Sequence, residues 1–357
     1  MSEQSNQKTH ISEIDQEEVE AKLEFALIDA VKKKPADILL LSGGIDSSLL
    51  AALDRKPLAL TVTLEGKGRD VRYAQEVAES LSMKWHHIEL SEDEALRMVS
   101  EVVFHLHSYD PGILNDIPLY AAMKYALSLG YKTVRTGDGG DDLFGGYSFS
   151  WSKDGRSLDS DYHRKFLKEL YPHLRFSSNV MAKSFGVGLH HPYLDPRVAE
   201  LAISMDLKYK VQRVPKDQVG DIYYQLGETN DSENRNVWSK IILRRIARKY
   251  LPSSVVYRSR TDLEYGSGSY LLEDRLASQI SDKQVRELEE SGVKLWNESN
   301  RPSLKKMHAY LRLIFDSQNL HVPPVESDEY PCNWCGGGVV KGRSHCFTCG
   351  GWPANKE

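Results

Sequence analysis

The sequence predicts an α/β protein built on a parallel sheet with helices on both faces, followed by a mostly helical part and a small cysteine module. Strand-like apolar runs alternate with helix-like segments and polar turns between residues 37 and 136. From about residue 160 onward the pattern is mostly helical, and all four cysteines lie between residues 332 and 349. Alternating strands and helices favour a parallel sheet that is covered on both faces.

The composition is that of a folded globular chain. Its 357 residues leave room for one large domain and a smaller module. Lys+Arg 46 against Asp+Glu 51 gives a net charge of -5, which excludes the basic field of a protein that coats nucleic acid. No apolar run reaches the roughly 18 residues that cross a bilayer, and the first twenty residues are too polar and acidic for a signal peptide. We therefore expect a cytoplasmic protein with no membrane partner.

The elements follow in order. Val19, Leu23, Leu27 and Val31 recur at four-residue spacing, which predicts an amphipathic helix over 13–34 that Pro35 ends. The continuously apolar run 37–41 is typical of a buried parallel strand. Further strands are expected at 58–63, 85–90 and 133–136, and helices at 49–53, 69–82, 93–107, 117–128 and 237–250. We expect an N-terminal helical segment over 1–35, the α/β domain over 36–320, a linker with three prolines over 321–331, and the cysteine module over 332–357.

A glycine turn, Ser42-Gly-Gly-Ile-Asp-Ser-Ser48, lies between the first predicted strand and a helix. Glycines let the backbone approach a ligand, and free amide groups at a helix N-terminus attract anions. Serine hydroxyls add donors, and Asp46 can hold Mg²⁺ against phosphate oxygens. The turn lacks the Gly-Lys-Ser/Thr of a Walker loop. The alternative is a plain turn whose serines cap the helix.

A second loop, Thr136-Gly-Asp-Gly-Gly-Asp-Asp-Leu-Phe-Gly-Gly-Tyr147, places three carboxylates among five glycines after another predicted strand. In a parallel sheet both loops emerge at the carboxyl edge, where such folds bind ligands. A calcium loop is the alternative, but the spacing does not match an EF-hand.

The two motifs together resemble the synthetase domain of asparagine synthetase and its β-lactam synthetase relatives. These belong to the ATP pyrophosphatases, with an adenine nucleotide alpha-hydrolase-like fold. The resemblance continues through 61–90, His191-Pro-Tyr-Leu-Asp195, Lys240-Ile-Ile-Leu-Arg244 and Leu251-Pro-Ser-Ser-Val-Val-Tyr-Arg258, and covers about residues 36–270. It implies a ligase that activates a carboxylate as an acyl-adenylate, releases pyrophosphate and lets ammonia or an amine attack.

The resemblance also implies roles for individual residues, with ATP and Mg²⁺ as cofactors. Asp46 and Asp141 would hold Mg²⁺, and Asp138 and Arg260 would be catalytic. Two carboxylates opposite a triphosphate need bridging metal to avoid repulsion. The nucleotide would be bound by Leu41, Ser42, Gly43, Gly44, Asp46, Ser47, Ser48, Val62, Gly137, Asp141 and Arg258.

The chain departs from this family in several places. Residue 2 is Ser2 and no cysteine lies near it, so we expect no glutaminase half; the nitrogen would come from free ammonia, a substrate amine or a separate ammonia donor. Asp138 stands where asparagine synthetases have glutamate, and it could still accept the proton of the amine. Arg260 stands where a lysine is usual, and arginine can neutralise phosphate charge.

Two neighbouring segments bear on the same site. Residues 239–260 contain seven Lys/Arg and no Asp or Glu, and Gly266-Ser-Gly-Ser269 beyond them could hinge a lid. Gly188-Leu-His-His-Pro192 replaces the Glu-x-Arg-x-Pro of asparagine synthetases, so His190 and His191 are candidates for substrate recognition or for a buried turn. Aspartate is therefore not a safe choice as the activated acid.

The four cysteines form two Cys-x₂-Cys-Gly turns, at Cys332/Cys335 and Cys346/Cys349. Two such turns complete a tetrahedral Cys₄ site, which favours a structural zinc ribbon, with an iron–sulfur cluster as the alternative. Lys341, Arg343, Trp334 and Trp352 could grip RNA or a protein partner, or the module could simply pack on the main domain.

Three functions remain open from the sequence. The first is the carboxylate-activating ligase, acting on a small-molecule or macromolecule-borne acid. The second is a tRNA-modifying ATP pyrophosphatase that holds RNA with the ribbon. The third is a non-catalytic ATP-binding regulator or scaffold whose altered Asp138 and Arg260 have lost turnover.

Overall fold

The computed structural model describes residues 2–153, 157–213, 237–297, 301–341 and 343–354, with side chains from residue 16 onward. Its centre is a five-stranded sheet in the order β3-β2-β1-β4-β5, in which every neighbouring pair is parallel. The strands are β1 (Ile38–Leu40), β2 (Leu58–Leu64), β3 (Trp85–Leu90), β4 (Thr133–Arg135) and β5 (Gly188–His190). The predicted parallel α/β fold is confirmed; β5 is a strand that the sequence pattern did not predict.

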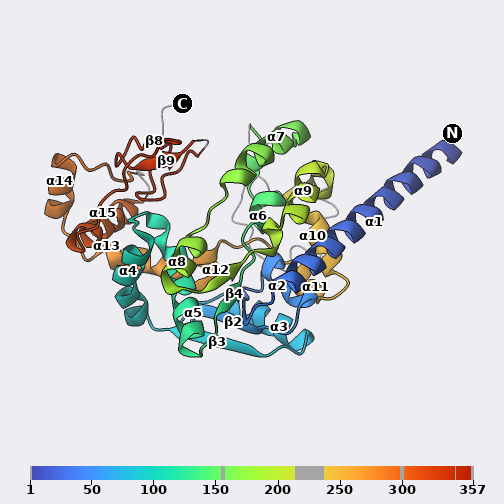
Figure 1. Cartoon of the computed structure of the whole chain (residues 1–357), viewed down its shortest axis with the longest axis horizontal. Coiled ribbons are helices and arrows are strands. Elements are labelled where there is room, and N and C mark those ends of the chain that lie inside the picture. The colour runs from blue at the N-terminus through green and yellow to red at the C-terminus, as the bar shows by residue number, and fades with distance from the viewer. Residues whose placement is uncertain (1, 154–156, 214–236, 298–300, 342, 355–357) are drawn as a thin grey trace.

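Helices cover both faces of this sheet (Figure 1). Successive β1 residues enter different cores, because side chains alternate across a strand: Leu39 joins one cluster and Ile38 the other. The first face is packed by α1 (Ser2–Lys33), α2 (Ile45–Leu53), α3 (Val71–Ser80), α9 (Pro196–Ser204), α10 (Ile241–Ala247) and α11 (Ser253–Val256). The other face is packed by α4 (Glu92–Leu106), α5 (Asp116–Ser128) and α8 (Ser177–Phe185).

The remaining elements connect or extend these layers. They are η1 (Pro111–Asn115), α6 (Gly140–Leu143), α7 (Ser160–Leu170), α12 (Leu263–Ser267), α13 (Leu272–Ala277), α14 (Asp282–Glu290) and α15 (Pro302–Ser317), with the strand pair β6 (Gln212–Arg213) and β7 (Val237–Trp238). The predicted helical second half is confirmed in outline. No helix of the described ranges is long and apolar enough to cross a membrane.

One predicted helix is wrong over its first part. The sequence pattern predicted a helix over 237–250, but Val237 and Trp238 form β7 and α10 begins only at Ile241. Lys240 adopts a left-handed backbone with φ +58, which no residue inside an α-helix can have. The reason is tertiary: the Lys240 side chain reaches two carboxylates described below, and the chain turns sharply to present it.

The C-terminal module begins with an antiparallel hairpin of β8 (Glu329–Pro331) and β9 (Gly338–Val340). β8 therefore lies inside the segment 321–331 that we expected to be a linker, and the division of the chain into domains stays a prediction. Figure 1 shows the hairpin beside α4, α13 and α15, on the opposite side of the molecule from α1. Cys332, Val339 and Ala354 belong to the same buried cluster as α4 and α15.

A buried arginine ties three elements of the first face together. Arg135, at the end of β4, is 0% exposed and pairs with Asp54 at 2.8 Å. It also donates to the Val31 and Lys34 carbonyls at 2.9 and 3.0 Å. One guanidinium group therefore holds the end of α1 and the end of α2 against β4.

We expect Arg135→Met to lower the free energy of unfolding by about 3 kcal/mol, because it leaves Asp54 and two carbonyls without their donor. Urea denaturation followed by circular dichroism measures the change. Arg97→Met, at an exposed position on α4, is the matched control and should change stability by under about 0.5 kcal/mol. Equal loss in the two variants would contradict the role given to Arg135.

Candidate active site

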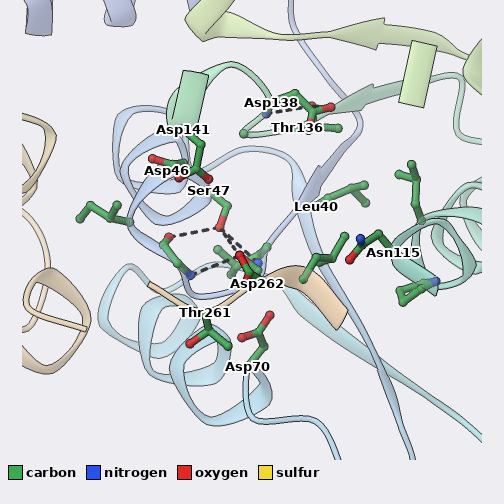
Figure 2. A pocket seen from close by; sticks show the side chains of 18 of the residues that line it. Leu40, Asp46, Ser47, Asp70, Asn115, Thr136, Asp138, Asp141, Thr261 and Asp262 are labelled. Carbon is green, nitrogen blue, oxygen red and sulfur yellow. Dashed lines mark hydrogen bonds between the residues drawn. The ribbon is translucent and has the colours of Figure 1, made fainter. Parts of the chain in front are cut away.

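The two glycine loops meet at the centre of the sheet. β1 lies between β2 and β4, so the chain leaves β1 and β4 in opposite directions and a crevice opens between the loops that follow them. A cavity of about 530 Å³ lies there. Figure 2 shows Asp46 and Asp141 on one side of it, Thr136 and Asp138 above, and Asn115 on the far side.

The first loop is held by its own serines and by close packing on α3. Gly44 N donates to Ser42 Oγ at 3.2 Å, and the Ser42 and Ser47 hydroxyls lie 3.1 Å apart. Gly43 has φ +70, and a Cβ there would lie 2.5 Å from the Tyr73 Cβ. Only glycine fits this position. α2 begins at Ile45, earlier than predicted, so Asp46 and Ser47 occupy its first turn, where amide groups are free to bind anions.

The second loop lies directly against the first. A Cβ on Gly140 would lie 2.6 Å from Asp46 Cγ, and a Cβ on Gly139, at φ +89, would lie 2.6 Å from a Leu194 methyl carbon. The glycines thus allow α6 to approach the first turn of α2. This approach brings Asp141 beside Asp46.

Lys240 lies between these two carboxylates. Its ammonium group is 2.9 Å from Asp141 Oδ1 and also hydrogen-bonds Asp46 Oδ2, and its side chain is only 5% exposed. Arg260 adds a second cation, with Nε 3.0 Å from Asp141 Oδ1. Lys240 was not among the site residues predicted from the sequence, although it belongs to the stretch 239–260, which has seven Lys/Arg and no Asp or Glu.

Burial and charge act against each other in this group. Burial raises the pKa of Asp46; Lys240 opposes that shift and Asp141 adds to it. At Asp141 burial also favours the protonated acid, but Lys240 and Arg260 outweigh it and lower the pKa. For Lys240, burial disfavours the ammonium form, yet Asp141 and Asp46 raise its pKa. We therefore treat Lys240 and Asp141 as charged at neutral pH.

The residues present fit a divalent cation. Asp46 Oδ1 is buried and has no hydrogen-bond partner among the residues that the structure describes. A buried carboxylate oxygen without a donor is unfavourable unless a cation or water completes it. Carboxylate oxygens with phosphate oxygens are the usual ligands of Mg²⁺ in nucleotide sites. Asp46 and Asp141 are therefore suited to hold Mg²⁺.

Arg258 and Arg260 differ in their surroundings. Arg258 donates to the Ser42 carbonyl at 3.0 Å, pairs with buried Asp70 and lies 4.1 Å from the centre of the Tyr73 ring. It therefore holds the first loop against α3. Arg260 is partly exposed, pairs with Asp262 at 2.7 Å as well as with Asp141, and lies over the Tyr147 ring. Arg260 faces the cavity with a cation that a ligand can reach.

Asp138 belongs to a chain of hydrogen bonds. Thr136 Oγ1 donates to Asp138 Oδ2 at 2.9 Å, and Ser178 Oγ donates to the same oxygen at 2.7 Å. His191 Nδ1 lies 2.7 Å from Thr136 Oγ1, and Asn179 Nδ2 donates to His191 Nε2 at 3.1 Å. This arrangement requires the His191 proton on Nδ1. Burial lowers the pKa of His191 despite the opposing effect of Asp138, so the ring is neutral.

The two histidines therefore have different surroundings. His191 lies 3.5 Å from Asp138, a carboxylate partner that the sequence did not reveal. His190 is buried, and burial together with Arg135 and Lys34 lowers its pKa to about 4. Neither histidine lines the cavity; His191 acts on it only through Thr136 and Asp138.

Most of the residues predicted to bind nucleotide or to be catalytic line this one cavity. Only Gly43 and Ser48 do not, because Gly43 faces α3 and Ser48 is fully buried within α2. Sequence reasoning missed several lining residues that lie far from both motifs in the chain, namely Asp70, Asn115, Asp116, Phe176, Ser178, Lys240 and Glu264. No spacing pattern links these residues; the fold alone brings them together.

Asp116 and Asp142 are two further acids of the lining whose pKa values are raised. Burial raises the pKa of Asp116 to about 7, with contributions from Asp110 and Asp138 that a hydrogen bond from Ser177 opposes. Burial, Asp141 and Asp138 raise the pKa of Asp142 to about 7. Strongly shifted groups in a cavity are typical of functional sites.

The four cysteine sulfurs form a second site, distant from the first in the chain. All four lie within 4.8 Å of one another, and the Cys332–Cys349 and Cys335–Cys346 sulfurs are both 3.7 Å apart. A tetrahedral ion with Zn–S bonds of about 2.3 Å places sulfurs about 3.8 Å apart. Backbone amides of Trp334, Gly337 and Gly351 donate to three of the sulfurs. The cluster fits a structural zinc ion.

Part of the surface expected to grip RNA is used inside the chain. Arg343 donates to the His173 carbonyl at 3.1 Å, and Trp334 packs against Trp296 with ring centres 5.6 Å apart. Lys341 is exposed and Trp352 is 58% exposed. Packing of the module on the main domain therefore accounts for two of the four residues.

The cavity lies where the strand order reverses and between two glycine loops that carry carboxylates, which is where open parallel sheets of α/β enzymes bind their ligands. Comparison with known proteins gives the family: residues 22–160 and 150–299 match the model for asparagine synthase. The chain belongs to the asparagine synthase family, a family of ATP-dependent carbon–nitrogen ligases. The family predicted from the two loops is confirmed.

Individual proteins that are similar in sequence are asparagine synthetases as well. The chain is 28% identical over 321 residues to asparagine synthetase B [glutamine-hydrolyzing] of Escherichia coli, covering 82% of this chain and 53% of that protein. It is 27% identical over 308 residues to asparagine synthetase [glutamine-hydrolyzing] 1 of Lotus japonicus, covering 80% and 49%. The chain thus spans about half the length of these relatives. An NH3-dependent NAD synthetase from Campylobacter jejuni matches 47% of the chain at 18% identity and TM-score 0.27, too low to bear on the fold.

We expect Lys240→Met to destabilise the protein by about 3 kcal/mol without divalent cation, because two buried carboxylates lose their shared partner. Adding Mg²⁺ should raise the Tm of this variant more than that of the wild type, since the cation replaces the ammonium. Thermal unfolding with and without Mg²⁺ tests this. Lys249→Met, at a side chain 46% exposed, is the control. Equal Mg²⁺ effects in all three proteins would contradict the shared site.

For the cysteine cluster we expect one tightly bound Zn²⁺ per chain by elemental analysis. Replacement by Co²⁺ should give the visible absorption of a tetrahedral thiolate site, and Cys346→Ser should lose both metal and thermal stability. Iron with labile sulfide in freshly purified protein would instead identify an iron–sulfur cluster.

Proposed function

We propose that this chain is an ATP-dependent ligase that adenylates a substrate carboxylate, releases pyrophosphate and transfers the acyl group to ammonia or an amine, forming an amide. The observation that carries the proposal is the meeting of Asp46 and Asp141 at one buried lysine, at the edge of a single cavity. Family membership supports the same reaction class.

The nucleotide would lie along the ends of β1 and β2. Leu40, Leu60 and Val62 give this wall an apolar surface suited to adenine, and the first turn of α2 offers amide donors to phosphate. Asp46 and Asp141 would hold Mg²⁺, which supplies charge neutralisation to the phosphates when bound. Lys240 keeps both carboxylates in place and limits their mutual repulsion.

Arg260 would act on the charge that develops as pyrophosphate leaves. Its guanidinium group cannot give up a proton at neutral pH, so it stabilises the leaving group electrostatically and takes no part in proton transfer. Asp141 and Asp262 hold it at the cavity wall.

Asp138 would accept the proton of the attacking amine. Thr136 and Ser178 hydroxyls occupy its Oδ2, which orients the carboxylate and leaves Oδ1 for the amine. Thr136 is in turn held by His191, which fixes the direction of its hydroxyl proton. The shorter side chain of aspartate thus comes with an ordered support.

The wall around Asp138 is rich in carboxyl groups and suits an amine. Within the described residues, no lysine or arginine forms an ion pair with Asp116, Asp138, Asp142 or Glu264, whereas the nucleotide side has Lys240 and Arg260. The negative charge of this wall would repel the carboxylate of a substrate and attract an ammonium group. Free ammonia, an amine of the substrate, or ammonia from a separate donor would meet this wall; a protein or RNA partner remains a prediction.

The direct test is exchange of labelled pyrophosphate into ATP in the presence of Mg²⁺ and pools of carboxylic acids. Exchange that depends on one acid supports the ligase and narrows its substrate. Tight ATP binding without exchange for any acid would favour the non-catalytic regulator. Exchange only in the presence of co-purified RNA would favour the tRNA-modifying alternative.

We expect Asp138→Asn to keep pyrophosphate exchange within about threefold of wild type but to reduce amide formation about 10²-fold, because only the second step needs a base. Asp138→Glu should retain measurable amide formation. Asp161→Asn, at a side chain 95% exposed, is the control. A parallel loss of both steps in Asp138→Asn would assign the residue to adenylation.

A further inference from the structure

The second cysteine turn, residues 345–350, contacts the segment that leads into the cavity wall. Tyr109 N donates to the Thr348 carbonyl at 2.8 Å, and Ser108 Oγ donates to the Phe347 carbonyl at 2.7 Å. His345 Nε2 lies 2.7 Å from Asp110 Oδ2. Three consecutive residues, Ser108 to Asp110, are therefore bound to the turn that carries Cys346 and Cys349.

Asp110 also contacts η1. Its other oxygen, Oδ1, accepts from Gly112 N at 2.8 Å, the cap that begins η1. The same carboxylate thus binds the cysteine turn with one oxygen and starts the 3-10 helix with the other. The packing is close: a Cβ on Gly350 would lie 2.5 Å from Asp110 Oδ1, and Gly350 has φ +71.

η1 ends in the wall of the cavity. Asn115, its last residue, and Asp116, the next, both line the cavity, and Asn115 hydrogen-bonds Glu264 on α12. Figure 2 shows Asn115 on the side away from Asp46 and Asp141. η1 therefore belongs to the wall opposite the metal-binding carboxylates.

Contacts from α15, and from Trp296 in the segment before it, hold the same unit. Arg312 donates to the Tyr109 hydroxyl at 3.1 Å, and His308 stacks on Tyr109 with ring centres 5.5 Å apart. Trp296 Nε1 donates to the Gly350 carbonyl at 3.1 Å. The cysteine turn and the segment that leads into η1 therefore both pack against α15 and the residues just before it.

We propose that the second cysteine turn is a latch that positions η1, so that the metal module sets the placement of Asn115 and Asp116 in the substrate wall. Asp110 and His345 are positioning residues in this device. The proposal rests on the ligase function for what the wall binds, namely the amine substrate and not ATP. Loss of these contacts weakens the binding of that substrate. It leaves the two glycine loops, which follow β1 and β4, in place.

The test compares Asp110→Ala with Asp110→Asn in the full chain, after elemental analysis has shown that both retain metal. The alanine loses both contacts, whereas the asparagine amide can still accept from Gly112 and bond His345. Hydrogen–deuterium exchange of peptides covering 108–116 should accelerate roughly tenfold in the alanine variant and stay near wild type in the asparagine variant. Asp161→Ala is the surface control.

Ligand binding gives the second readout. In Asp110→Ala we expect the Kd for ATP to stay within about twofold and the KM for the amine to rise about fivefold or more, whereas Asp110→Asn should keep both values near wild type. Unchanged exchange of 108–116 in the alanine variant, or an equal loss of ATP binding, would overturn the latch. If Asp110→Ala fails to fold, Ser108→Ala removes the hydroxyl that donates to the Phe347 carbonyl and accepts from Asp110 N, and leaves both Asp110 carboxylate contacts, so it tests the same turn more mildly.

The latch can be tested independently of the proposed function. Deuterium exchange and ATP binding need no turnover, so they test the latch even if no acid supports pyrophosphate exchange. Removing the metal with a chelator should likewise accelerate exchange in 108–116 before it does so in peptides covering 38–53.

Discussion

The active site depends on one buried ammonium group placed between two carboxylates that come from different loops. Asp46 and Asp141 belong to loops about a hundred residues apart, and their charges would drive those loops apart in a low-dielectric crevice. Lys240 neutralises part of that repulsion, and Arg260 shares Asp141. The acid-free stretch 239–260 thus has a physical meaning: it supplies cations to a site that the two earlier loops make acidic.

The glycines of the two loops make this arrangement possible. Gly43 lets the first loop lie on α3, and Gly140 lets the second lie on Asp46. Arg258 donates to the Ser42 carbonyl and pairs with buried Asp70, so the loop is also held on its core side. The first loop is therefore held by contacts within the protein itself, and contacts formed before a ligand binds reduce the ordering that binding requires.

The sequence was sufficient for the elements whose pattern is local and not for those set by tertiary contact. The strand at 37–41 was predicted from its apolar run, and those at 58–63, 85–90 and 133–136 from the alternation of strand-like and helix-like segments with polar turns. β5 was missed because Gly188–His190 is three residues long and gains its identity only from pairing with β4. The start of α10 was misplaced because the left-handed backbone of Lys240 serves two distant carboxylates. Asp46 and Asp141 could be predicted because they lie in the two glycine loops, to which the family resemblance assigns Mg²⁺ binding. Asn115 and Asp116 lie in a segment without a motif, and Lys240 was noticed only as part of a family-like segment, with no role assigned.

The buried cluster that joins α4 and α15 also contains Cys332, Val339 and Ala354, which lie beyond the last residue matched by the family model. The apolar faces of α4 and α15 have therefore been shaped to a partner inside the same chain. A relative that lacks the cysteine segment has to cover those faces with other side chains or make them polar. Amino-acid changes on the buried faces of α4 and α15 should accordingly follow the presence or absence of the four cysteines.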